Sequence, residues 1–394
     1  MLPILKDFFN NLEEHDVRYV HWKSNERLHS FLNGESDLDL LFSPVDRLKV
    51  HEILKKINAK KYNALGSKSY ENIEDYLAVD DSTGRLIHFH IHFQLDIGEK
   101  GVKRYPVPWL KDVLDNRIKD ESSNVWITSH EHEILLLIVR EALRIPPLKS
   151  FLLPKRIHIS DKSHNEFEWL KSRCDEEKLS EIINSLFQSN KGSTDVIFKT
   201  YNEGLTVENL CQLGNDLSFF RKKIQTTNDI STVVLLVLHR FKKISSSILK
   251  RIDIYSPTQR INSRGGSIIV LTGSDGSGKS TTVQNLYTVF SRKIDVVKLY
   301  FGTPKPEKSN FPKVVSLIGK LKLKRLHNLY VKKRNLKKAL KLKEKGVLVL
   351  CDRFPQSIYP GNMDGPLCSD WKNSKNFLKK WFFQFEKQVF QKIE

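Results

Sequence analysis

Cysteine is scarce in this sequence, and the few thiols present are widely spaced. The 394 residues include four cysteines, and no two of them form a Cys-x-x-Cys pair: Cys174, Cys211, Cys351 and Cys368. Disulfide frameworks are dense in cysteine, and zinc knuckles use closely spaced thiols. The spacing therefore argues against both and predicts a protein of the reducing cytosol.

The sequence also lacks a long apolar run. The longest runs, "ILLLIV" at 134–139 and "VVLLVL" at 233–238, are far shorter than the roughly 20 residues of a membrane-spanning helix. The opening stretch "MLPILKDFFNNLEEHD" has no basic segment followed by an apolar core and a cleavage site. It is typical of an amphipathic helix and not of a signal peptide. We therefore expect a soluble, cytoplasmic protein.

Negative charge is in the minority, with 46 acidic against 65 basic residues and a net charge of +19. The excess is concentrated in 313–346, which holds thirteen Lys and Arg and one acid, Glu344. An apolar stripe runs through this segment: Leu326, Leu329, Tyr330, Leu336 and Leu340. The pattern predicts a packed helix with a basic outer face.

Three interpretations of this basic segment remain open. The first is a solvated helix face beside an anionic substrate. The second is attraction of residues 313–345 to a membrane surface or an acidic polymer. The third is nucleic-acid binding, but no aromatic platform or recognised nucleic-acid motif accompanies the charge, so we expect no nucleic-acid partner.

The most specific motif is "VLTGSDGSGKSTT" at 270–282. Residues 267–272 are apolar and β-branched, as in a buried strand of a parallel sheet. The glycines permit a sharp turn, and "KSTTVQNLYTVF" from Lys279 has helical spacing. The order strand, glycine loop, helix and the spacing Gly-x4-Gly-Lys-Ser match the phosphate-loop pattern in full.

In such a loop, backbone N–H groups and the helix N-terminus bind phosphate oxygens. Lys279 is expected to reach the β- and γ-phosphates, and the Ser280 hydroxyl to ligate Mg²⁺. The predicted cofactors are ATP and Mg²⁺. The predicted nucleotide-binding residues are Gly273, Ser274, Gly276, Ser277, Gly278, Lys279, Ser280 and Thr281.

Two further strands are expected after this loop, at 295–301 and within "GVLVLCDRFPQS" at 346–357. The second ends in Asp352 and Arg353. Ligands of open parallel sheets gather at the carboxyl ends of the strands. The phosphate loop, Gly302 and the Asp-Arg pair are therefore expected to converge there.

These residues resemble the thymidylate kinase family of P-loop nucleotide kinases. The resemblance rests on "GSDGSGKST" and "CDRFP" and covers roughly 265–394. It implies that Asp352 acts near Mg²⁺ and the reacting phosphates and that Arg353 grips the acceptor phosphate. Asp275 would lie near the transferred phosphate. The family continues with a fourth strand, an arginine-bearing lid and an adenine loop, so we expect a truncated form of its fold.

The N-terminal stretch "YVHWKSNERLHSFLNGESDLDLLFSP" holds a second motif. "DLDLLF" alternates, so Asp37 and Asp39 are expected on one face of a strand, where two carboxylates can bind a divalent cation. The segment resembles the nucleotidyltransferase superfamily, whose signature is a Gly-Ser pair followed by Asp-x-Asp on a strand. Lys23-Ser24 stands at the position of that Gly-Ser pair.

A histidine-rich stretch, "RLIHFHIHFQLDIG" at 85–98, is the expected source of a third ligand. If it forms one strand, alternate polar residues share a face: His88, His90, His92, Gln94 and Asp96. His92 or Asp96 could complete a site with the two aspartates. A two-carboxylate Mg²⁺ site, a zinc site and a polar face without metal all remain open.

We expect an α/β protein in four blocks. They are an α+β nucleotidyltransferase-like domain (1–125), a mainly helical region (126–245), a linker (246–266) and a parallel-sheet P-loop domain (267–394). The leading hypothesis is a kinase that transfers a phosphoryl group from ATP to a nucleotide or other small acceptor, using Lys279. The alternatives are nucleotidyl transfer at the Asp-x-Asp motif and a non-catalytic, ATP-binding regulatory protein.

Overall fold

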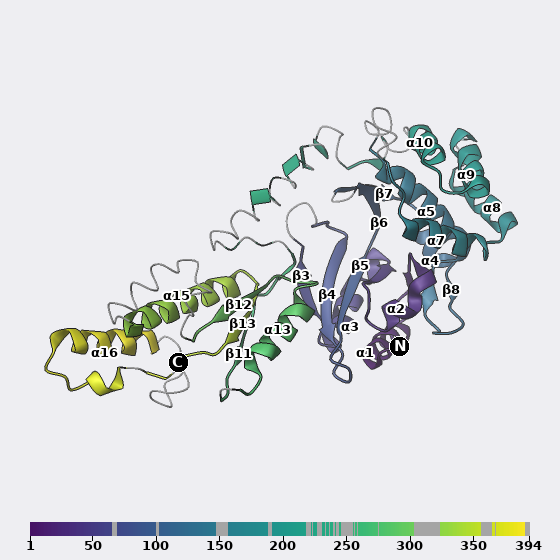
Figure 1. Ribbon diagram of the computed structural model, residues 1–394. Helices are drawn as coiled ribbons and strands as arrows, with labels where there is room; N and C mark the ends of the chain where they lie inside the picture. The colour runs from purple at the N-terminus through teal and green to yellow at the C-terminus, as the bar shows by residue number, and fades with distance from the viewer. Residues whose placement is uncertain are drawn as a thin grey trace. The chain divides into compact units, whose positions relative to one another are not determined.

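The computed structural model shows a mixed α/β protein that divides by its contacts into two compact units, 1–256 and 257–394 (Figure 1). It describes residues 1–64, 69–99, 102–146, 157–187, 191–217, 259–274, 276–302, 324–355 and 368–390, with scattered residues between 222 and 257 and at 365–366. Asp275 and residues 313–323 of the basic segment lie outside the described residues.

The first half of unit one contains both helices and strands. Its elements are α1 (Pro3–Glu14), β1 (Tyr19–His21), α2 (Leu28–Leu32), β2 (Leu38–Phe42), α3 (Arg47–Lys56), β3 (Lys60–Asn63), β4 (Ile73–Val79), β5 (Leu86–His92), β6 (Leu95–Glu99), β7 (Val102–Val107), α4 (Leu110–Asp115), β8 (Ile118–Lys119) and β9 (Trp126–Ile127). Its main sheet is mixed, with strand order β3-β4-β5-β2-β1-β9-β8, and β6 and β7 form a separate antiparallel pair.

The two faces of β5 have different roles. Ile87, Phe89 and Ile91 lie in a core with α1, where the Phe8 and Phe89 rings are 4.9 Å apart. Side chains alternate between faces along a strand, so the histidines at the intervening positions lie on the other face. Strands β2 and β5 are parallel, with Asp39 opposite His90. This register is what brings an aspartate beside the histidines.

The described residues between 130 and 217 are mainly helical. The helices are α5 (His130–Arg144), α7 (Asp161–Lys171), α8 (Glu176–Leu186), α9 (Lys191–Glu203) and α10 (Val207–Asp216). Residues 132–143 of α5 are all buried, because α7, α8, α10 and β6 pack around this helix. The apolar run at 134–139 is thus the centre of a core that also contains Val20 and Leu41 of the main sheet.

Unit two contains a parallel sheet. Its elements are β10 (Ile261–Asn262), β11 (Ile268–Leu271), α13 (Lys279–Phe290), β12 (Val296–Tyr300), α15 (Lys324–Glu344), β13 (Leu348–Asp352) and α16 (Phe377–Phe390). Strand β13 lies between β11 and β12, and both neighbours run parallel to it. Leu271 and Tyr300 each pair with Asp352, so the carboxyl ends of the three strands meet at this residue.

Two sequence expectations for this unit need adjustment. The strand at 268–271 forms, but Ile269 and Val270 are each 37% exposed, because α13 and α15 pack over β12 and β13 and leave β11 at the edge. Within the predicted linker, the backbone N–H groups of Asn262 and Gly266 donate to Gly346 and Lys343. The end of that segment is therefore part of unit two.

Helix α15 has the expected basic outer face but a different apolar stripe. Leu329 and Leu336 are buried, whereas Tyr330 is 61% and Leu340 is 42% exposed. Four basic side chains of the helix are exposed: Arg334, Lys337, Lys341 and Lys343.

Candidate functional site

The phosphate-loop residues lie between β11 and α13. Gly278 precedes the helix with φ 80°, a left-handed conformation that glycine adopts without strain. A Cβ on Gly273 would lie 2.9 Å from the Ser277 hydroxyl oxygen. Glycine at these two positions therefore allows the tight turn that leads into α13.

The lysine of this loop folds back over it. Lys279 Nζ donates to the carbonyl oxygen of Gly273 at 2.9 Å and to that of Ser274. These carbonyls hold an ammonium group directly above the loop backbone. The same ammonium can exchange these carbonyl contacts for phosphate oxygens, which are stronger acceptors because they are charged.

The loop is joined to the end of β13 by one short hydrogen bond. Ser280 Oγ donates to Oδ2 of Asp352 at 2.6 Å. The other carboxylate oxygen, Oδ1, is buried and has no hydrogen-bond partner among the described residues. A hydroxyl and a carboxylate with a free lone pair are oxygen ligands of the kind that Mg²⁺ prefers, so these side chains fit the metal that the motif implies.

Arg353 follows Asp352 in a left-handed conformation, with φ 65°, which is uncommon for a residue with a side chain. Its N–H donates to the Leu271 carbonyl at 3.2 Å. A Cβ on Gly302 would lie 3.0 Å from Cδ of Arg353. The predicted residues of 273–281, Gly302 and the Asp-Arg pair thus lie at one end of the sheet, with Asp275 outside the described residues.

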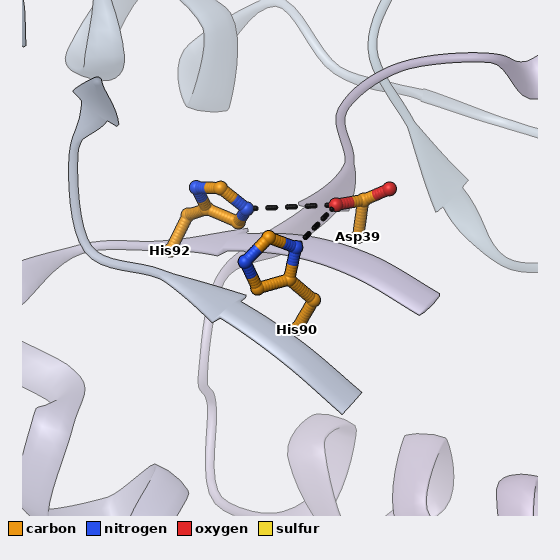
Figure 2. Close-up of side chains that lie close together, drawn as sticks. All are labelled: Asp39, His90 and His92. Carbon is orange, nitrogen blue, oxygen red and sulfur yellow. Dashed lines mark hydrogen bonds and ion pairs between the residues drawn. The ribbon is translucent and has the colours of Figure 1, made fainter. Parts of the chain in front are cut away.

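A second group of polar side chains surrounds Asp39 in unit one. His90 Nδ1 lies 2.9 Å and His92 Nε2 lies 3.5 Å from its Oδ1 (Figure 2). Lys23 Nζ lies 2.9 Å from the same oxygen. Burial by itself raises the pKa of Asp39, but the Lys23 ammonium and the two histidines hold it well below its usual value. Asp39 is therefore an anion shared by three nitrogen groups.

The surroundings of the two histidines of this group favour their uncharged forms. Burial lowers the pKa of His90 and, together with the neighbouring His90, lowers the pKa of His92 well below its usual value. Burial and Lys23 also lower the pKa of Lys103 on β7 to about 7. Several basic groups of limited exposure therefore act on the one Asp39 carboxylate.

The other predicted aspartate has different partners. Asp37 Oδ1 lies 2.9 Å from Nδ1 of His88, whose Nε2 lies 2.7 Å from Asp75 on β4. Asp37 directly precedes β2 and its side chain is 36% exposed. The two aspartates of the Asp-x-Asp motif are thus held by separate histidines.

The prediction of one continuous histidine strand through Asp96 is wrong. Strand β5 ends at His92, the chain bends at Phe93 and Gln94, and Asp96 belongs to β6, opposite Pro106. Gln94 accepts a hydrogen bond from Asn72 at 3.2 Å. The bend breaks the alternation, so of the two proposed third ligands only His92 joins Asp39.

Ser24, at the Gly-Ser position of the resemblance, is bound by a carboxylate. Its N–H donates to Oε1 of Glu166 at 3.1 Å, and its hydroxyl donates to Oε2 at 3.3 Å. Asn25 donates its N–H to Glu133 at 3.0 Å. Glu166 also pairs with Arg140 at 3.0 Å. The donors that a triphosphate would need are thus occupied by side chains of α5 and α7.

The carboxylates that accept hydrogen bonds from this loop, Glu133 and Glu166, were not predicted from the sequence. Burial and the Glu166 charge raise the pKa of Glu133 to about 8. Glu133 and Glu166 are 108 and 142 residues from the backbone groups that they accept from, and no local pattern indicates such pairing. Lys103 was missed for the same reason, since it reaches the group through the separate pair β6–β7.

The chain was compared with protein-family models, curated proteins and solved structures, and these comparisons assign it to no family. No protein-family model matches the chain, no curated protein matches it, and neither does any solved structure. In the described part of the chain, none of the helices combines the length and apolar character needed to cross a membrane.

Proposed function

We propose that unit two is a cytoplasmic, ATP-dependent phosphotransferase that acts on a nucleotide or another small acceptor. The observation that carries the proposal is the 2.6 Å hydrogen bond from Ser280 to Asp352. It joins a complete phosphate-loop sequence to a carboxylate at the end of the central strand. Phosphoryl transfer depends on this kind of positioning and on neutralisation of charge more than on covalent chemistry.

In this proposal, the N–H groups of the loop and the start of α13 bind the β- and γ-phosphates of ATP. The Lys279 ammonium exchanges its hydrogen bonds to the loop carbonyls for hydrogen bonds to phosphate oxygens. Ser280 and Asp352 hold Mg²⁺, which supplies charge neutralisation when it is bound. Arg353, fixed through its backbone at the end of β13, orients the acceptor through its planar guanidinium, which suits phosphate oxygens.

The exposed basic face of α15 supports an anionic acceptor or an anionic surface as partner. Arg334 and Lys337 are exposed on this helix, and such a field raises the local concentration of anions. We propose the smaller partner, a phosphorylated small molecule, because α15 packs on β12 and β13 of the same sheet as the phosphate loop.

The proposal is tested by product analysis with labelled ATP and Mg²⁺ over a panel of nucleoside monophosphates, nucleosides and sugars. ADP that forms only with one acceptor supports the proposal and names the substrate class. Release of pyrophosphate would instead indicate nucleotidyl transfer at the Asp-x-Asp motif of unit one. Tight ATP binding without turnover over the whole panel would support a regulatory nucleotide-binding protein and contradict the proposal.

A further inference from the structure

We propose that Asp39, His90 and His92 form a binding site for a divalent transition-metal ion such as Zn²⁺, and that the Lys23 ammonium competes with the metal for Asp39. The site lies in unit one and is independent of the phosphotransferase proposal for unit two. It differs from the two-carboxylate Mg²⁺ site that the nucleotidyltransferase resemblance implies.

The spacing of the three side chains suits a small metal ion. Their ligand atoms all lie within 4.8 Å of one another. Oδ1 of Asp39 is 2.9 Å from Nδ1 of His90 and 3.5 Å from Nε2 of His92 (Figure 2). Ligand atoms about 2.0–2.1 Å from a tetrahedral Zn²⁺ lie about 3.3 Å from each other. Small side-chain movements are enough to reach that geometry.

His92 provides a second, independent indication of a missing partner. Its side chain is fully buried, and its Nδ1 has no hydrogen-bond partner among the described residues. Its Nε2 likewise has no hydrogen-bond partner among those residues and lies 3.5 Å from Oδ1 of Asp39. Buried polar groups are nearly always satisfied, and metal coordination would give Nε2 the partner that it lacks, in the uncharged form that the surroundings of His92 favour.

The ligand set does not fit Mg²⁺. Mg²⁺ prefers oxygen ligands in an octahedral arrangement, whereas this cluster offers one carboxylate and two imidazoles. The second carboxylate of the motif, Asp37, is engaged by His88 at 2.9 Å. Imidazole nitrogens favour Zn²⁺ and other late first-row ions, so the donor set points to that class.

Lys23 determines how easily a metal can enter. Its ammonium lies 2.9 Å from the same Oδ1 and 4.6 Å from the centre of the Trp22 ring. Its side chain is 22% exposed, so it has access to solvent if it leaves Asp39. An ammonium and a metal ion cannot both occupy this position without strong repulsion. Metal binding therefore requires Lys23 to move away, and removal of its charge should strengthen binding.

The test uses the full chain, freed of metal with a chelator and titrated with Co²⁺ and then Zn²⁺. Co²⁺ uptake is followed by visible absorption and Zn²⁺ uptake by calorimetry. We expect one more bound ion per chain in the wild type than in His90→Ala or His92→Gln. We expect Lys23→Met to bind about tenfold or more tightly. Circular dichroism checks that each variant is folded.

Two control variants replace an aspartate and a histidine that lie outside the Asp39–His90–His92 group. Asp37→Asn removes the other aspartate of the motif, and His51→Ala removes a histidine that meets one carboxylate, Glu74, at 2.6 Å. Both should retain the wild-type stoichiometry. Equal metal uptake by wild type and both histidine variants would overturn the proposal. An unchanged metal affinity in Lys23→Met would also overturn it, and this variant keeps all three proposed ligands.

Discussion

The Ser280 hydroxyl lies 2.6 Å from the Asp352 carboxylate, although 72 residues separate them in the chain. The contact exists because β13 lies beside β11 in the parallel sheet, with Leu271 opposite Asp352. The phosphate loop follows directly from β11, so the sheet order brings the first residues of α13 to the end of β13. This relationship is the structural basis for the phosphotransferase proposal.

Replacement of Lys279 tests whether the loop binds nucleotide. Lys279→Ala should weaken ATP binding by at least about tenfold, because it removes the only side-chain cation that the motif places on the β- and γ-phosphates. Calorimetry with ATP and Mg²⁺ measures the effect. Lys298→Ala, at an exposed lysine of β12 that donates to Gln284, is the matched control and should keep the wild-type affinity. Equal affinities in both variants would reject the loop assignment.

Replacement of Asp352 separates binding from catalysis. Asp352→Asn keeps an oxygen that can accept the Ser280 hydrogen bond but removes the charge that would hold Mg²⁺. We expect turnover to fall by roughly 10²–10³, the scale of losing one transition-state electrostatic contact, while ATP affinity changes much less. Glu344→Gln, at an exposed carboxylate at the end of α15, should leave kcat unchanged. A wild-type kcat in Asp352→Asn would contradict the metal role.

The ion pair beneath Ser24 should matter for stability. Arg140 and Glu166 are both buried. Glu166→Ala removes the 3.0 Å partner of Arg140 and leaves its guanidinium with the longer 3.6 Å approach to Glu141, so it should destabilise unit one by up to about 3–5 kcal/mol. Glu168→Ala, on an exposed position of the same helix, should change stability by less than about 0.5 kcal/mol. Urea denaturation compares the two variants with the wild type, and similar midpoints for both variants would show that the pair contributes little.

The pH dependence of stability should report Glu133. Its pKa in the folded chain is about 8, above the ordinary 4.5, so the folded state holds a proton that the unfolded state releases. Stability should therefore fall as the pH rises from about 4.5 to about 8. Glu133→Gln cannot ionise and should flatten this dependence, measured as the free energy of unfolding across that window. An identical slope in wild type and variant would assign the dependence to other groups.

Local patterns were sufficient to predict the three strands of the parallel sheet and helix α13 in unit two. The strands expected at 267–272, 295–301 and 346–357 all form, and α13 begins at Lys279 as predicted. Glycine placement and apolar runs are local signals, so they are readable from the sequence. The exposure of Ile269 and Val270 was not, because it depends on which strands α13 and α15 cover.

The Asp39 cluster could be predicted only in part. Alternation placed Asp39 and the histidines on strands, but the register of β2 against β5, which sets Asp39 opposite His90, is a non-local property. The bend after His92 has no strong turn residue in "HFQLD", so the strand was extended too far. Lys23 was recognised only as a replacement for glycine, and its contact with Asp39 depends on how β1 pairs with β2.

The measurement that tests the central claim most directly is transfer of the γ-phosphate of labelled ATP to an acceptor, with wild type and Lys279→Ala measured side by side. We expect wild type to label one acceptor of the panel and to form an equal amount of ADP, and we expect the variant to do neither. Labelling at the same rate in both proteins would contradict the phosphotransferase proposal. Wild-type protein that binds ATP but labels no acceptor of the panel would contradict it as well.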